Sequence, residues 1–192
     1  MIILGVDCST ATMGLALMDD EEILNLNYIK PVGLTLLDKY KSIRSPLRDM
    51  YDSYRVKPEV LVVESPVISM MNNSKSKGKT TAYILGQLMR WNGFAQAALF
   101  ETFDVPIVEM TAPHARKLAL GYAVVKGMRV KDAVFEAISE IYGVEWPTGM
   151  HGEPLMECYD MADAIILSRA LFKKGKSLRD SLKESESEGM EG

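Results

Sequence analysis

The first thirty residues alternate between short apolar runs and small polar turns. Residues 2–6 form a continuous apolar run, which is typical of a strand buried on both faces. Residues 13–18 form a second apolar run after the polar turn 9–12, and residues 23–29 partly alternate, as an edge strand does. Because the connections between these runs are short, we expect three strands in an antiparallel meander.

The remainder of the chain alternates between helical and strand-like patterns. Apolar residues recur at three- and four-residue steps from Leu36 to Tyr54, which predicts a helix that Pro46 kinks or splits. The other expected elements are strands at 59–64 and 105–110 and helices at 80–103, 113–120, 129–142 and 158–172. A meander followed by strands that alternate with helices predicts an α/β fold, with a mixed five-stranded sheet flanked by helices.

Length and composition narrow the class of the protein. Its 192 residues suit one compact domain at residues 1–175, and the Ser- and Glu-rich segment 176–192 is expected to be a disordered tail. No run approaches about 20 apolar residues, so we expect no membrane span. The start of the chain lacks the features of a secretory signal, and two cysteines are too few for a disulfide framework. A cytoplasmic protein is therefore expected.

Four acidic residues fall at positions where α/β folds form their sites. Asp7 and Glu64 end the first and the fourth expected strand, and sites are common at strand ends in open α/β sheets. Asp160 and Asp163 open the last expected helix, and their three-residue spacing places both carboxylates on one helical face. The helix is otherwise apolar around them, so two acids at this place are unusual.

Each acid has a structural explanation when it is taken singly. The helix dipole favours Asp160 in a first turn, and Asp7 and Glu64 suit turns that follow strands. Together, four carboxylates without His or Cys partners favour a site for Mg²⁺ or Mn²⁺, which prefer oxygen ligands. Four like charges share a pocket only when cations or protons compensate them. Two cations about 4 Å apart at such a site support phosphodiester hydrolysis.

Several motifs resemble, in their order and spacing, those of the RuvC-type Holliday junction resolvases, a family with the RNase H-like fold. The resemblance covers residues 1–172. Its motifs are Ile3-Leu4-Gly5-Val6-Asp7 with Gly14-Leu15-Ala16, Val62-Val63-Glu64-Ser65-Pro66, Leu85-Gly86-Gln87 and Tyr159-Asp160-Met161-Ala162-Asp163-Ala164. The resemblance implies a metal-dependent, structure-selective DNA endonuclease, similar to phage-type members, that resolves four-way junctions as a homodimer.

The resemblance also implies roles for individual residues. The four acids match the family's catalytic metal ligands, with two Mg²⁺ or Mn²⁺ ions in each site. Arg116 and Lys131 fall where the family has basic residues that contact DNA near the scissile phosphate. The segment after the second acid matches the loop that probes the centre of the junction. It holds no aromatic residue here, so the expected wedge between bases is Ile68, Met70 or Met71. This departure leaves open whether the substrate is the four-way junction alone or a wider range of branched DNA.

The net charge of −4 conceals an uneven distribution of charge. Residues 70–131 carry nine basic and three acidic side chains, a net charge of +6, whereas the tail is acidic. Flexible cations in a loop rich in Ser, Gly and Asn suit contacts with DNA phosphates. The expected DNA-binding cations are Lys75, Lys77, Lys79, Arg116, Lys117 and Lys131.

Three other functions remain open at this point. An RNase H-like domain that cleaves RNA would use the same acids. A degenerate domain that binds branched DNA or a partner protein without cleavage would not need all four acids, yet all four are present. A nucleotide-binding domain of the actin and sugar-kinase type also begins with a strand, an acid and a small-residue turn, which residues 7–14 provide. That fold needs two such domains, and this chain supplies one.

Overall fold

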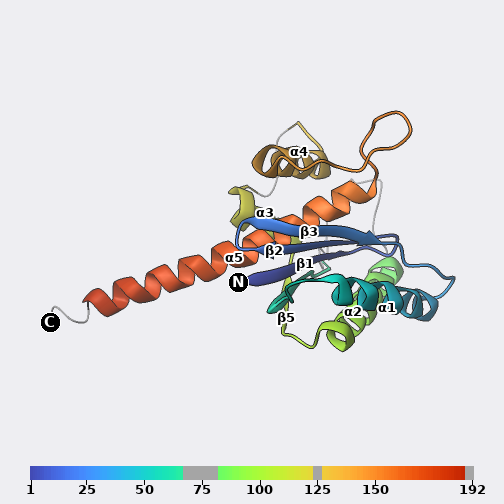
Figure 1. The fold of residues 1–192 in the computed structure, drawn as a ribbon, viewed down its shortest axis with the longest axis horizontal. Coiled ribbons are helices and arrows are strands. Elements are labelled where there is room, and N and C mark those ends of the chain that lie inside the picture. Colours follow the sequence, from blue (N-terminus) through green and yellow to red (C-terminus); the bar gives the residue numbers. More distant parts are fainter. Residues whose placement is uncertain (67–81, 123–126, 189–192) are drawn as a thin grey trace.

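The computed structural model describes residues 1–66, 82–122 and 127–188. Within these residues, one sheet has five strands in the order β3-β2-β1-β4-β5 (Figure 1). The strands are β1 (Ile2–Cys8), β2 (Met13–Asp19), β3 (Glu22–Ile29), β4 (Val60–Glu64) and β5 (Ile107–Met110). β2 pairs antiparallel with β1 and β3, whereas β4 pairs parallel with β1 and β5. The predicted meander and the mixed five-stranded sheet are confirmed.

Helices cover both faces of this sheet (Figure 1). They are α1 (Leu36–Ser53), α2 (Ala82–Phe103), α3 (Ala112–Leu120), α4 (Val130–Tyr142) and α5 (Glu157–Glu188). On one face, α1 and α2 contribute Leu47 and Trp91 to a core with β1, β2 and β4. On the other face, α3, α4 and α5 form a second core that includes Val134 and Ile165. In the described ranges, every helix is too short or too polar to cross a membrane.

Two helices differ from the sequence-based expectation. The sequence predicts a kink or a break at Pro46. The break does not occur, because α1 runs through this exposed residue and buried Ile43 and Leu47 hold the helix on the sheet. The sequence also predicts a helix end near Phe172 and a disordered tail, whereas α5 continues to Glu188. Residues 173–188 contain no proline, and their four Lys and three Glu favour helix. Figure 1 shows this part of α5 projecting beyond the sheet.

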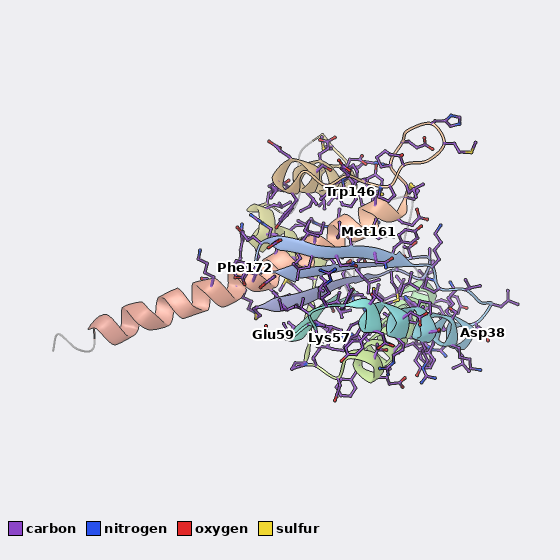
Figure 2. The ribbon with its side chains drawn as sticks, viewed as in Figure 1. Asp38, Lys57, Glu59, Trp146, Met161 and Phe172 are labelled. Carbon is purple, nitrogen blue, oxygen red and sulfur yellow. The ribbon has the colours of Figure 1, made fainter. Side chains whose placement is uncertain are left out.

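The segment between α4 and α5 packs back onto α4. The rings of Trp146 and Phe135 have centroids 5.0 Å apart, and Nε1 of Trp146 donates a hydrogen bond of 2.7 Å to Oγ of Ser139. Figure 2 shows Trp146 and Met161 on the same side of the sheet, opposite Lys57. These contacts fix the segment that leads into α5.

Candidate active site

Two of the four predicted acids lie at the carboxyl ends of neighbouring parallel strands. Asp7 is the penultimate residue of β1, and Glu64 is the last residue of β4. Val6 of β1 pairs with Val63 of β4. Asp7 and Glu64 are the next residues of these strands, so they lie side by side at one end of the sheet. Asp7 is buried, and Glu64 is half-buried.

The other two acids reach the same place from α5. Asp160 and Asp163 lie one turn apart near the start of α5, and each is only 8 % exposed. α5 lies directly against β1 and β2 at two glycines. A Cβ atom on Gly14 would lie 2.2 Å from the carbonyl oxygen of Asp160, and one on Gly5 would lie 2.1 Å from that of Ala164. The two glycines therefore permit the approach that brings the α5 acids to the strand ends.

The charges of the neighbouring carboxylates raise the pKa of two of the four acids, Asp7 and Asp163. Burial raises the pKa of Asp7 well above its usual range, and the charges of Glu64 and Asp163 raise it further. A hydrogen bond between Asp7 and Glu64 contributes in the same direction, as expected when two carboxyl groups share a proton. Burial and the charge of Glu64 raise the pKa of Asp163 to about 6. The carboxylates of this site therefore cannot all stay ionised unless protons or cations compensate their charge.

Lys131 of α4 contacts this group of acids directly. Its Nζ lies 3.0 Å from Oδ1 of Asp160, in an ion pair that is also a hydrogen bond. Burial alone would lower the pKa of Lys131, but the hydrogen bond to Asp160 and the charges of the other carboxylates hold it above its usual value. The sequence predicts Lys131 as a DNA contact, and the structure places it against one of the four acids, where it supplies a compensating positive charge.

The other predicted DNA-binding residues fall into two groups. Arg116 and Lys117 lie on α3. Arg116 is half-buried, and its charge opposes the raised pKa of Asp163, so it lies within electrostatic reach of the acids. Lys117 is exposed in the last turn of α3, where the helix dipole alone favours a cation. The second group lies outside the described residues and comprises Ile68, Met70, Met71, Lys75, Lys77 and Lys79.

The chemistry of the four acids fits a hard divalent cation. All four are carboxylates, and Mg²⁺ and Mn²⁺ prefer oxygen ligands. Within residues 1–66, 82–122 and 127–188, no group of three His, Cys, Asp or Glu side chains has the close spacing of a formed metal site. In the structure, Lys131 offsets part of the negative charge, and the raised pKa of Asp7 favours its protonated form. The donor set and its burial therefore fit a cation, and binding would need the ligands to draw together.

Two side chains of α2, not predicted as site residues, hold the ends of the strands. Nε1 of the fully buried Trp91 donates a hydrogen bond of 2.8 Å to the carbonyl oxygen of Ser9, two residues after Asp7. Nδ2 of Asn92 donates a hydrogen bond of 2.7 Å to the backbone carbonyl of Glu64. Asn92 is buried. In the sequence, a polar amide on the inner face of an apolar helix indicates that it has a hydrogen-bond partner in the core.

Comparison with solved structures identifies proteins of similar fold. RuvC of Thermus thermophilus matches with a TM-score of 0.60 and 19 % identity, over 92 % of this chain and 97 % of that chain. RuvC of the same organism in complex with a Holliday junction substrate matches with a TM-score of 0.59 and 16 % identity, over 88 % and 92 %. A ROK hexokinase from Thermus thermophilus has a TM-score of 0.40 and 14 % identity, over 64 % and 39 %. No family model and no curated protein sequence matches the chain. The chain therefore has the RuvC-like, RNase H-like fold that the sequence predicts.

Proposed function

We propose that the protein is a metal-dependent endonuclease that cuts branched DNA, above all four-way junctions, by phosphodiester hydrolysis. The observation that carries this proposal is the convergence of four carboxylates, three buried and one half-buried, from β1, β4 and α5 at one end of the sheet. The fold supports the choice of substrate, because it is shared with a RuvC whose structure contains a Holliday junction. Forks and other branched DNA are included, because the segment after Glu64 has no aromatic residue to restrict the enzyme to junction centres.

The four acids, from two strand ends and one helical face, would hold two divalent cations, Mg²⁺ or Mn²⁺. Such cations lower the pKa of a bound water and stabilise the leaving oxygen in phosphodiester hydrolysis. Lys131 and Arg116 lie beside the acids, and their positive charges orient the scissile phosphate. The acids, the cations and these two basic side chains together make up the catalytic site.

The outer face of α2 supplies a surface for a homodimer. Gly86, Gly93 and Ala97 fall along this face. Met89 and Phe100 lie beside them and are 48 % and 54 % exposed, which is unusual for large apolar side chains. A Cβ atom on either glycine would meet open space, so a second helix can approach the α2 backbone closely. Two copies joined here would provide the two symmetric cuts that a four-way junction requires.

Sedimentation of the purified protein tests the dimer. We expect the wild-type chain to sediment as a dimer and Gly93→Arg to sediment as a monomer, because a long charged side chain fills the proposed contact. Gly175→Arg on α5 is the matched control and leaves the dimer intact, since its added side chain also meets open space. A monomeric wild-type chain, or a dimeric Gly93→Arg variant, contradicts this assignment.

A cleavage assay tests the nuclease activity and its substrate. Labelled four-way junction, replication fork, linear duplex and RNA are incubated with the protein, with and without Mg²⁺. We expect Mg²⁺-dependent cleavage of the four-way junction, followed by the fork, and little cleavage of the duplex. If no branched DNA is cut with Mg²⁺, the proposal fails, and cleavage of RNA alone would favour the RNA-processing alternative.

Asp160→Asn separates DNA binding from catalysis at the same site. Because this change removes a ligand charge, we expect cleavage of the junction to fall by at least about 100-fold while junction binding persists. Glu140→Gln, an equal loss of charge on the exposed face of α4, is the control and keeps full activity. Normal cleavage by Asp160→Asn would show that the acids are not the catalytic ligands.

A further inference from the structure

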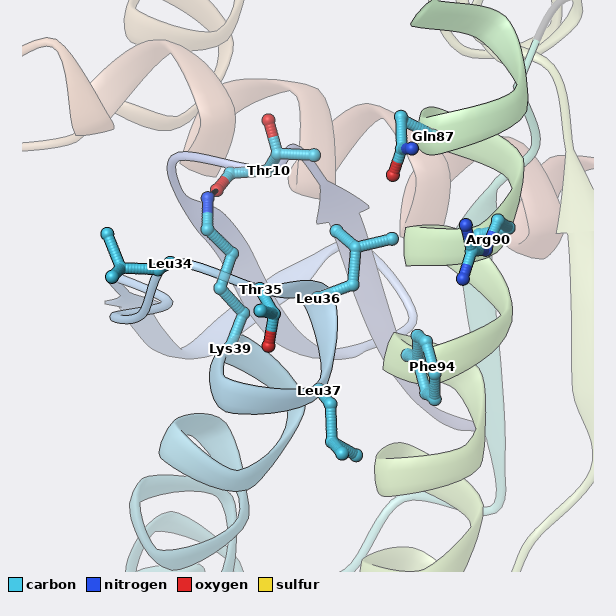
Figure 3. Close-up of a pocket in the computed structure, with 9 residues that line it drawn as sticks. All are labelled: Thr10, Leu34, Thr35, Leu36, Leu37, Lys39, Gln87, Arg90 and Phe94. Atoms are coloured by element: carbon cyan, nitrogen blue, oxygen red, sulfur yellow. Dashed lines mark hydrogen bonds between the residues drawn. The ribbon is translucent and has the colours of Figure 1, made fainter. Parts of the chain in front are cut away.

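A groove of about 460 Å³ opens between the start of α1 and the first half of α2 (Figure 3). Leu36 of α1 and Phe94 of α2 contribute apolar side chains to its lining. Thr10, from the turn after β1, and Gln87 of α2 contribute a hydroxyl and an amide. Figure 3 shows these groups arranged around one space, with the α2 residues facing those of α1. The groove therefore combines an apolar surface with groups that form hydrogen bonds.

Positive charge borders the groove on both sides. Nζ of Lys39 donates a hydrogen bond of 2.6 Å to the carbonyl oxygen of Thr10, which uses one of its three N–H groups. Arg90 lies across the groove on α2, between Gly86 and Gly93 and so at the border of the face proposed for the dimer. In the single chain it is exposed and has no hydrogen-bond or ion-pair partner within the described ranges. The positive end of the α1 dipole begins at Thr35, which also lines the groove. The two cationic side chains attract an anionic group, whereas Asp38 in the first turn of α1 offsets the dipole.

No acidic side chain offsets this charge among the described residues that line the groove. The acid nearest in sequence is Asp38, in the first turn of α1. Its carboxylate accepts hydrogen bonds from the backbone N–H and the hydroxyl of Thr35, at 3.1 and 2.7 Å. Asp38 therefore offsets the dipole of α1 at its N-terminus, and the attraction for an anion rests on Lys39 and Arg90.

The aromatic side chain of the groove is held in a fixed position. The ring of Phe94 packs against that of Tyr40, with centroids 5.7 Å apart. A fixed aromatic ring beside cations is the arrangement that binds single-stranded nucleic acid, because the base stacks on the ring and the cations contact the phosphate. The amide of Gln87 both donates and accepts, which suits the edge of a base. These groups together match one nucleotide.

The groove also lies near the candidate active site. Thr10 follows Asp7 by three residues, a chain distance of at most about 11 Å. Arg90 directly precedes Trp91 and Asn92, the two α2 residues that hydrogen-bond to the strand ends. A DNA strand bound at the acids can therefore reach the groove within a few nucleotides.

We propose that this groove binds an unpaired nucleotide of branched DNA, with its phosphate between Lys39 and Arg90 and its base against Phe94. The inference deepens the proposed function and rests on it for the identity of the ligand. Bases at a branch point leave their stack more readily than bases within a continuous duplex. The groove therefore selects branched over linear DNA at a place separate from the cleavage chemistry.

Fluorescence anisotropy with a labelled strand of about ten thymidines tests the groove, in buffer without divalent cations so that cleavage does not interfere. We expect Arg90→Gln to weaken binding about tenfold and to reduce the slope of log affinity against log salt by about 0.7. Phe94→Leu keeps an apolar side chain but loses the stacking face, so we expect about fivefold weaker binding with an unchanged slope. Arg55→Gln, an equal loss of charge on an exposed residue beyond the far end of α1, is the matched control and leaves the affinity unchanged.

Four results separate this inference from its alternatives. Equal affinities of wild type, Arg90→Gln and Arg55→Gln for the strand overturn it. Thymidine monophosphate that binds as tightly as the strand overturns the assignment to DNA and indicates a site for free nucleotides. If the wild-type protein cuts the junction but Arg90→Gln does not change strand binding, only the proposed role of the groove is contradicted. If Arg90→Gln loses strand binding but the wild-type protein does not cut the junction, only the proposed function is contradicted.

Discussion

The two faces of the sheet are packed in different ways, and the difference explains how the acids are positioned. On the α5 face, Gly5 and Gly14 bring the backbones of strand and helix together, so closely that a Cβ atom would lie less than 3 Å from a backbone oxygen. On the opposite face, large side chains such as Leu47 and Trp91 fill the space between the helices and the sheet. Backbone contact leaves little room for adjustment, whereas side chains relax in part after a change.

The same contrast applies to the two pairs of acids. Asp160 and Asp163 are positioned by steric contact between α5 and the strands. The strand ends that carry the other two acids are held by hydrogen bonds from Trp91 and Asn92. We therefore expect substitutions at the glycines to have large effects, and substitutions of polar side chains on α2 to have smaller ones.

Gly14→Ala is expected to have the largest effect on stability. The added methyl group would overlap the carbonyl group of Asp160, so α5 and β2 must separate. We expect the free energy of unfolding to fall by more than about 3 kcal/mol, with loss of cleavage, in urea unfolding and junction assays. Gly175→Ala on α5 is the matched control, because its Cβ meets open space, and it raises stability by up to about 1 kcal/mol. A Gly14→Ala variant as stable as the wild type would show that the close contact does not position α5.

Asp163→Asn is expected to stabilise the metal-free protein at neutral pH. The pKa of Asp163 is raised to about 6 in the folded protein, against about 3.9 in an unfolded chain. A raised carboxyl pKa favours the folded state at low pH, and this benefit is lost as the pH rises through 6. Because Asn does not ionise, the free energy of unfolding of the variant exceeds that of the wild type by up to about 3 kcal/mol above pH 6 and by almost nothing near pH 4.

Urea unfolding at several pH values, with and without Mg²⁺, measures this difference. We expect Mg²⁺ to reduce the advantage of Asp163→Asn at pH 7.5, because a cation that binds only the folded wild-type site stabilises it. Glu140→Gln is the control for loss of an exposed acid and shows no such pH dependence. A constant difference between Asp163→Asn and the wild type from pH 4 to pH 8 would contradict the electrostatic account of the site.

The sequence predicts the acids better than the contacts that position them. Strands and helices follow from local periodicity, so the strand ends at Asp7 and Glu64 and the helical spacing of the α5 acids are readable directly. The contact of Gly14 with α5 and the ion pair between Lys131 and Asp160 join residues far apart in sequence. Such contacts depend on how helices pack on the sheet, which periodicity does not specify. The length of α5 was also missed, because polar composition alone does not exclude a helix.

Asn92→Ala is expected to have a moderate effect on the α2 face. It removes the hydrogen bond to the carbonyl of Glu64 and leaves that oxygen without its side-chain partner. We expect the free energy of unfolding to fall by about 1–2 kcal/mol and junction cleavage to fall several-fold, because the end of β4 gains freedom. Asn25→Ala, at an exposed position of β3, is the control and changes stability by less than about 0.5 kcal/mol. If Asn92→Ala weakens cleavage no more than Asn25→Ala does, the α2 hydrogen bonds do not position the site.

Tyr54→Phe is expected to have the smallest effect and the opposite sign. Burial raises the pKa of Tyr54, and its hydroxyl has no hydrogen-bond partner among the described residues. Removal of an unsatisfied buried hydroxyl stabilises a protein by up to about 1 kcal/mol, whereas Tyr51→Phe, at a half-buried position, changes little. Urea unfolding of both variants provides the measurement, and a destabilised Tyr54→Phe variant would mean that the hydroxyl has a partner. Contacts on the α1–α2 face would then be as sensitive to a small change as those on the α5 face, where backbone atoms exclude a single methyl group at Gly14.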